Sequence, residues 1–285
     1  MTRELGQPHR EAGKENKELK EQLAKNPVFI VGVPRSGTTM LYNILVRHPS
    51  FTGKTEPIWN TETSIFKKYL RHTNGFFEEG KWPFWYEYFN GNEHYFSEFQ
   101  KESIRSFLVN AALARGSNRI LEKTPNHVEH LDFIFETFPQ ALAVHIIRHP
   151  VDVFASMRKR AQITPLDKDP WLRVSHDEFA QDYVRKVDGT EDYRSDDRLL
   201  AIRYEDLTLS PTDEVEKVLK FIGENFNDSV LTGDTPFMIE GKFPYQSNVP
   251  VPNSNNWGGL VIPNEVEEIQ RICFPVMQKY QYENY

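Results

Sequence analysis

Residues 27–49 read PVFIVGVPRSGTTMLYNILVRHP, and this stretch decides the fold. Its first part, residues 28–33, is almost wholly apolar, which is typical of a short strand buried on both faces. Proline and glycine then mark a sharp turn, and residues 38–47 carry apolar side chains at helical spacing. A strand that turns through glycine into a helix directs free backbone N–H groups and the positive end of the helix dipole to one point. The sequence therefore predicts an anion site, most often one for phosphate, at this turn.

The spacing within the turn makes the prediction more specific. Gly32 and Gly37 are separated by four residues and are followed by Thr38 and Thr39, which is the phosphate-loop pattern with one substitution. Thr38 stands where a nucleotide triphosphatase has its lysine, and Arg35 supplies a cation from inside the loop. This departure disfavours an ATPase or an ordinary kinase. It favours a nucleotide with fewer phosphates or with a different terminal group; the alternative is an unoccupied strand-to-helix turn.

Strand-like and helix-like segments alternate along the rest of the chain. We expect further strands at 118–122, 141–147 and 199–204, and helices at 58–72, 99–114, 126–138, 151–160, 177–187, 212–222 and 264–280. This order predicts an α/β fold, a three-layer sandwich with a mainly parallel central sheet and helices on both faces. In such a fold, ligands bind beyond the carboxyl ends of the strands.

The chain is expected to form one domain. Residues 1–26 are rich in Lys and Glu and are interpreted as a polar N-terminal arm, and residues 27–285 as the single domain. Residues 76–99 contain eleven aromatic side chains among 24 residues and are interpreted as an insertion. The insertion either packs irregularly on the core or forms a lid or a wall for an apolar ligand.

Composition excludes several classes of protein. A net charge of −7 over 285 residues disfavours a nucleic-acid partner that is bound by a broad basic face. Cys273 is the single cysteine, so an internal disulfide and a thiolate metal cluster are both excluded. The chain has no apolar run of the roughly 20 residues that would span a bilayer, and its start is too polar for a signal peptide. We therefore expect a cytoplasmic protein with no membrane segment in this chain.

The quoted stretch leads to a family resemblance. FIVGVPRSGTTML resembles the 5′-phosphosulfate loop of the sulfotransferases that use 3′-phosphoadenosine 5′-phosphosulfate (PAPS), and further motifs extend the resemblance over residues 28–207. The nearest motif pattern is that of the tyrosylprotein and bacterial-type branch. The resemblance implies a P-loop-containing nucleotide hydrolase-like fold, PAPS as donor, and the bisphosphate PAP as product. No metal is implied, and the scattered histidines show no ligand spacing.

The resemblance also implies how both ends of the donor are bound. The residues implied for the 5′ end are Arg35, Ser36, Gly37, Thr38 and Thr39. Arg148 and Ser156, eight residues apart in HIIRHPVDVFASM, match the family's 3′-phosphate pair, although His149 and Pro150 replace the commoner Asp-Gly. Tyr204 matches a position near the adenine. Without the resemblance, Arg148 would be a surface ion-pair partner and Tyr204 a half-buried tyrosine at a strand end.

Catalytic roles are implied for three residues. Lys123, in ILEKTP, corresponds to a lysine that stabilises the charge developing on the leaving phosphate. Glu56, which follows the loop arginine by 21 residues, matches the catalytic base of the tyrosylprotein branch. His127 is the strongest rival base, ahead of His48 and of His145, which is expected in the core. Ser247 or residues 253–256 could close over the donor.

The sequence thus predicts a sulfotransferase that moves a sulfuryl group to a hydroxyl or an amine of a small molecule, such as a natural product, by in-line displacement. The alternatives are a P-loop small-molecule kinase and a non-catalytic nucleotide-binding protein. The acidic charge and the Glu-containing aromatic segment favour a small apolar or cationic acceptor over a sulfated polysaccharide. Oligomeric state is not predicted.

Overall fold

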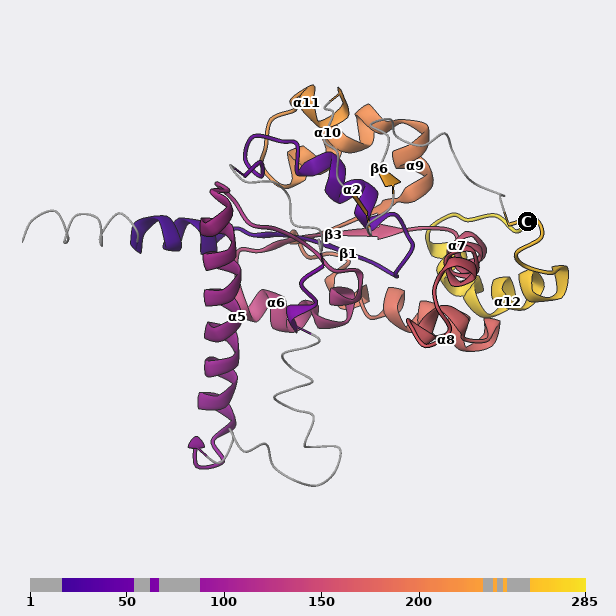
Figure 1. Ribbon diagram of the computed structural model, residues 1–285, viewed down its shortest axis with the longest axis horizontal. Helices are drawn as coiled ribbons and strands as arrows, with labels where there is room; N and C mark the ends of the chain where they lie inside the picture. The colour runs from indigo at the N-terminus through magenta and orange to yellow at the C-terminus, as the bar shows by residue number, and fades with distance from the viewer. Residues whose placement is uncertain (1–16, 54–61, 67–87, 233–237, 240–242, 245–256) are drawn as a thin grey trace, which may run out of the picture.

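A parallel sheet of four strands forms the centre of the computed structural model, which describes residues 17–53, 62–66, 88–232, 238–239, 243–244 and 257–285 (Figure 1). The strands, in the order in which they lie side by side, are β2 (Leu121–Lys123), β1 (Val28–Val31), β3 (Leu142–Ile147) and β4 (Leu199–Arg203). Every neighbouring pair in this sheet is parallel, so the four strands end at the same edge. The predicted mainly parallel sheet is confirmed. A separate two-stranded pair joins β5 (Met238–Ile239) and β6 (Phe243–Pro244).

Helices cover both faces of the sheet. One face is covered by α2 (Thr38–Leu45), α9 (Tyr204–Leu209), α10 (Pro211–Phe221) and α11 (Ser229–Thr232). The other face is covered by α5 (Glu93–Arg115), the 3₁₀-helix η2 (Pro125–His130) and α6 (Leu131–Thr137). The remaining helices are α7 (Pro150–Ile163), α8 (His176–Asp188) and α12 (Pro263–Lys279), with the short turns η3 (Pro170–Arg173) and η4 (Glu191–Tyr193). The three-layer α/β prediction is therefore confirmed.

The alternation of side chains along β1 explains why this strand is central. Val28 and Ile30 pack into the cluster under α2 and α10, whereas Phe29 and Val31 pack into the cluster with α5 and α6. All four side chains are fully buried, as expected for a central parallel strand. α7, α8 and α12 enclose a third apolar cluster, at the right of Figure 1.

Several element boundaries differ from those expected from sequence. α5 begins at Glu93 rather than at 99, because the Asn92 side chain caps the helix by accepting from the backbone N–H of Tyr95. The expected helix over 126–138 divides into η2 and α6, and β2 extends to Lys123. The expected strand over 199–204 ends at Arg203, so Tyr204 is the first residue of α9.

Parts of the predicted organisation lie outside the described residues. These parts are most of the helix expected at 58–72, and the aromatic segment of 76–99 as far as residue 87. In the N-terminal arm, residues 17–25 are helical, and Leu23 is buried in the cluster that contains Phe29. None of the helices that the structure describes combines the length and the hydrophobicity that a bilayer-spanning segment requires.

Gly32, which directly follows β1, lies too close to β3 for any side chain. A Cβ atom at this position would lie 2.5 Å from the backbone oxygen of Ile146. The backbone N–H of Gly32 also donates to the carbonyl of Pro125 at 3.1 Å, so the chain has little freedom to move away.

We therefore expect Gly32→Ala to lower the free energy of unfolding by about 1–3 kcal/mol, because backbone must shift to relieve the overlap. Urea denaturation measures the change. Gly258→Ala is the matched control, since a Cβ there would meet nothing within 4 Å. Equal stability of the two variants would contradict the packing argument.

Candidate active site

Four of the segments singled out in the sequence lie at the carboxyl edge of the sheet. The loop of residues 32–37 follows β1, Lys123 ends β2, Arg148 follows β3, and Tyr204 follows β4. Because the strands are parallel, their carboxyl ends lie together, and this edge is where ligands bind in such folds. Four segments that are distant in sequence thus contribute to one place.

The loop between β1 and α2 has the backbone of an anion-binding turn. Gly37 adopts a left-handed conformation, with φ of 103°, directly before α2. Arg35 is also left-handed, with φ of 79°, which is rare for a residue with a side chain and is found at functional sites. The first turn of α2, which begins with Thr38, carries no acidic residue that would offset the positive end of the helix. Ser36 is fully buried, and its hydroxyl has no hydrogen-bond partner among the described residues.

The loop contacts the helix that carries the second predicted anion site. Arg35 Nε donates to Ser156 Oγ at 3.3 Å, across 121 residues of sequence. Ser156 lies on α7, which begins two residues after Arg148. The residues predicted for the two ends of the donor are thus neighbours, which sequence spacing alone does not require.

Arg148 and Tyr204 form a stacked pair beside the loop. The Arg148 guanidinium carbon lies 4.3 Å from the centre of the Tyr204 ring, which is a cation–π arrangement. Burial raises the pKa of the Tyr204 hydroxyl, although the charge of Arg148 opposes the shift. A Cβ on Gly37 would lie 2.4 Å from this ring, so only glycine at position 37 lets Tyr204 pack this closely against the loop. The carbonyl of Arg148 accepts from the Tyr183 hydroxyl at 2.7 Å, which anchors its backbone.

Lys123 is a buried cation that faces the phosphate loop. Its side chain is only 1% exposed, and Nζ donates to Thr39 Oγ1 at 3.2 Å. Nζ also donates to Glu62 Oε1 at 2.6 Å. Lys123 therefore joins β2 to the first turn of α2, as a lysine that acts on a ligand in the loop would have to do.

His127 belongs to a buried network next to Lys123. Its Nδ1 lies 2.9 Å from Glu122 Oε2, and the ring of Phe66 packs against it edge-on at 4.8 Å. Burial disfavours ionisation of Glu122, but the charge and hydrogen bond of His127, together with hydroxyls of Thr124 and Thr63, hold the pKa of this carboxyl below its usual range. The role of His127 as a base stays a prediction.

The remaining predicted bases differ in their surroundings. His48 Nε2 pairs with the carbonyl of Asn225 at 2.9 Å, and His48 Nδ1 accepts from the backbone of Ser50. His145 is fully buried in β3, as expected, and burial lowers its pKa to about 3. Glu56, Ser247 and the run at 253–256 lie outside the described residues.

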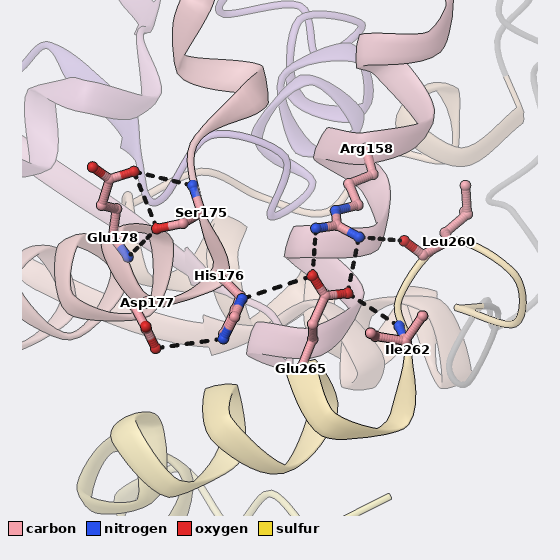
Figure 2. Close-up of polar contacts among 8 residues, drawn as sticks. All are labelled: Arg158, Ser175, His176, Asp177, Glu178, Leu260, Ile262 and Glu265. Carbon is pink, nitrogen blue, oxygen red and sulfur yellow. Dashed lines mark hydrogen bonds and ion pairs between the residues drawn. The ribbon is translucent and has the colours of Figure 1, made fainter.

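α7 is held in place by an ion pair with α12, as Figure 2 shows. The two terminal nitrogens of Arg158 donate to the two carboxylate oxygens of Glu265 at 2.9 and 2.6 Å. Arg158 also donates to the carbonyl of Leu260, and Glu265 accepts from the backbone of Ile262 at 3.1 Å. His176, at the start of α8, places Nδ1 3.7 Å from Glu265. This network fixes the helix that carries Ser156.

The C-terminal segment supports the residue after Arg148. His149 Nδ1 accepts from the backbone of Val151, and Nε2 lies 3.1 Å from the carbonyl of Glu283, to which it must donate. The Tyr285 ring stacks on His149 with ring centres 4.0 Å apart. Burial lowers the pKa of His149 to about 4, and the positive charge of Arg148 adds to the shift. His149 is thus a neutral helix cap that sequence reasoning regarded only as an altered turn.

A cavity adjoins the phosphate loop on the side of α7 and α8. Its apolar walls include Val33, Met157, Trp171 and Phe179. The polar and charged residues of its lining are Asn126, Glu178, Asp182 and Lys186. Among the described residues, no group of three or more His, Cys, Asp or Glu side chains is placed to hold a metal ion.

Sequence reasoning missed Glu62 and Glu122. Glu122 precedes the predicted lysine in the same motif, so its buried position on β2 could have drawn attention to it. Glu62 has no such signal, because its contact with Lys123 joins residues 61 positions apart.

Comparison with known proteins places this geometry in context. The model of a family described as "Sulfotransferase family" matches residues 27–228. A protein-tyrosine sulfotransferase of Drosophila melanogaster is 24% identical over 219 residues, which cover 72% of this chain and 39% of that protein. An omega-hydroxy-beta-dihydromenaquinone-9 sulfotransferase of Mycobacterium bovis is 25% identical over 249 residues, which cover 70% and 63%. The chain thus spans between about two fifths and two thirds of the length of these relatives.

A solved structure shares the fold. A mouse sulfotransferase complexed with PAP superposes with a TM-score of 0.52 at 16% identity, and the match covers 93% of this chain and 90% of that one. At this identity the likeness concerns the fold alone.

The neutral state of His149 generates a prediction about acid stability. An unfolded histidine binds a proton below about pH 6.5, whereas His149 in the folded chain stays neutral down to about 4. Between about pH 6.5 and 4 the unfolded state therefore binds more protons than the folded state. The free energy of unfolding should then fall, as the pH is lowered, by up to about 1.4 kcal/mol per pH unit from this group. Urea midpoints between pH 7 and pH 5 measure the slope.

His149→Asn should flatten that slope, since asparagine also caps a helix but does not titrate. The buried His145 adds a slope of the same sign and is unchanged in both proteins. The control is His94→Asn, at an exposed position of α5. A wild-type slope in His149→Asn would contradict the assignment.

Proposed function

Because this chain belongs to the sulfotransferase family, we propose that it moves a sulfuryl group from PAPS to a hydroxyl or an amine of a small-molecule acceptor. The observation that carries the proposal is the meeting of three basic residues, Arg35, Lys123 and Arg148, at one edge of the sheet beside a left-handed phosphate loop. A donor with an anionic group at each end of an adenosine requires cations at two separate points.

The residues present fit such a donor. The loop amides, the hydroxyl of the buried Ser36 and the charge of Arg35 suit the 5′ end. Arg148 and Ser156 suit the 3′-phosphate, and Ser156 accepts a hydrogen bond from Arg35 of the loop. The PAP complex of the mouse protein, which shares the fold, supports the same nucleotide here. Tyr204 is proposed to lie against the adenine.

The donor supplies a sulfuryl group that is already activated by its bond to the 5′-phosphate. In the transfer, the acceptor oxygen or nitrogen bonds to sulfur while the bond between sulfur and the phosphate oxygen breaks. Negative charge then grows on that phosphate oxygen, and the Lys123 ammonium, which already contacts the first turn of α2, is the group proposed to stabilise it.

A base must take the acceptor's proton. Glu56 is proposed for this role on its match to the tyrosylprotein branch, and it lies outside the described residues. His127 remains the alternative, although its ring is fully buried and is paired with Glu122.

We propose that the acceptor is a small, largely apolar molecule. The cavity beside the loop, with walls that include Met157 and Trp171, offers apolar surface next to the proposed donor site, and we propose that the acceptor binds there. The mycobacterial relative is described as acting on a hydroxylated menaquinone, which is a molecule of this kind. A kinase is disfavoured by the family match and by the loop without its lysine. A single cysteine suits a reducing compartment, so we propose a cytoplasmic site of action.

Two substitutions should separate the proposed roles. Lys123→Ala should lower kcat about 100-fold or more with donor Kd changed less than about threefold, because its charge acts mainly in the transition state. Arg148→Ala should instead raise donor Kd about tenfold or more, because it removes a charge from bound donor. Calorimetry with PAP and PAP release with an active acceptor measure the two quantities.

Lys217→Ala and Arg271→Ala, on the outer surfaces of α10 and α12, are the controls. Equal losses of binding and rate in both site variants would refute the assigned roles. Transfer of label from ATP with Mg²⁺ would favour a kinase, and donor binding without transfer to any acceptor in a broad panel would favour a non-catalytic protein.

The acceptor site yields a separate prediction. Trp171→Ala should raise the KM of an apolar hydroxylated acceptor about tenfold, since a large aromatic wall of the cavity is lost. The Kd for PAP should not change. Phe107→Ala, at an exposed position on α5, is the control. Activity restricted to polyanionic glycans would contradict the acceptor class.

A further inference from the structure

We infer that Glu62 is a positioning residue of this site, and that its carboxylate orients the ammonium of Lys123 toward the phosphate loop. The inference rests on the proposed function, in which Lys123 stabilises the leaving group. It is separate from the role proposed for Glu56, which lies outside the described residues, and from that of His127, whose ring pairs with Glu122.

The contacts of Lys123 determine where its charge points. A lysine ammonium has three N–H donors in tetrahedral arrangement. One is directed to Thr39 Oγ1 at 3.2 Å and one to Glu62 Oε1 at 2.6 Å. With two directions occupied, the third is determined, and the nitrogen is held at the first turn of α2, where the phosphate loop ends. A lysine without the second contact could rotate about its flexible stem.

Burial distinguishes this pair from an ordinary surface ion pair. The Lys123 side chain is 1% exposed, whereas the Glu62 side chain is 42% exposed. A buried ammonium needs hydrogen-bond acceptors to compensate for its lost hydration. Glu62 supplies a charged acceptor from the solvent side, so Lys123 can be charged and stationary within the sheet edge.

Contacts of the two following residues, Thr63 and Ser64, hold the backbone of Glu62 beside Lys123. The next residue, Thr63, donates from its hydroxyl to Glu122 Oε1 at 2.8 Å. The backbone N–H of Ser64 donates to Thr124 Oγ1 at 3.0 Å, and Thr124 donates in turn to Glu122 at 2.7 Å. Residues 62–64 are thus hydrogen-bonded to both sequence neighbours of Lys123, Glu122 and Thr124.

The segment of residues 62–64 is attached to the buried pair of Glu122 and His127. His127 contacts the carboxylate oxygen that Thr63 and Thr124 leave available, and Phe66 packs against the His127 ring. Because Glu122 is ionised and buried, it provides a strong acceptor for the hydroxyls that hold the segment. His127 therefore has a structural task that is distinct from its predicted role as a base.

A competing role for Glu62 can be distinguished by experiment. A carboxylate beside an anion site could hold Lys123 away from the donor until the donor displaces it. In that case removal of the carboxylate would tighten donor binding and leave kcat unchanged. A positioning role predicts the reverse: removal of the carboxylate lowers kcat and changes the donor Kd little.

The experiment compares Glu62→Ala, Glu62→Gln and Thr63→Val with the wild type, using PAP release with an active acceptor for kcat and calorimetry with PAP for donor Kd. We expect Glu62→Ala to lower kcat at least tenfold with Kd within about threefold. Glu62→Gln keeps an oxygen acceptor for Lys123 and should recover kcat to within about threefold of the wild type. Thr63→Val, which keeps the shape but removes one attachment, should give an intermediate kcat.

Glu216→Ala and Glu216→Gln, at an exposed position on α10, make the same changes in charge and are the controls. Unchanged kcat in Glu62→Ala, tighter PAP binding, or parallel losses in kcat and affinity would each overturn the inference. Thermal melts show whether Glu62→Ala folds. If it does not, the kcat and donor Kd of Glu62→Gln and Thr63→Val decide the inference. A wild type that transfers to no acceptor would refute the proposed function itself, whereas an active wild type with an equally active Glu62→Ala would refute only the role of Glu62.

Discussion

The parallel pairing of four strands is the constraint on which the rest of the structure depends. With β1 between β2 and β3, and β4 beyond β3, four chain segments reach the same edge. Three of them bring a cation: Arg35, Lys123 and Arg148. In a chain with a net charge of −7, such a gathering of positive charge has to be built locally. A local cluster of positive charge favours anions at that point even where the average surface charge is negative.

Each of these cations is held by a second layer of residues from elsewhere in the chain. Lys123 is held by Glu62, and Arg148 by the ring of Tyr204 and the hydroxyl of Tyr183. The helix that carries Ser156 is fastened to α12 through Arg158. Long basic side chains are flexible, so a site that must place charge accurately needs such supports. These supports come from segments spread along the chain, from Glu62 to α12.

Sequence patterns predicted the local structure well where the signal was local. The strand at 28–33 and the turn at Arg35 and Gly37 follow from apolar runs and glycine spacing, and both are found where expected. Patterns were less accurate at boundaries. The Asn92 cap that starts α5 was not recognised, and Tyr204 begins a helix rather than ending a strand. Such boundaries depend on single side-chain contacts, which periodicity does not contain.

The sequence by itself determined the fold class, the glycine turn after β1 and the presence of a cation near three of the four strand ends, because these properties follow from the order and spacing of residues within short segments. Only the tertiary structure decided which cation meets which partner. The contacts of Arg35 with Ser156 and of Lys123 with Glu62 join residues 121 and 61 positions apart. Their formation depends on strand order and helix packing, which place distant segments side by side without leaving a local trace in the sequence.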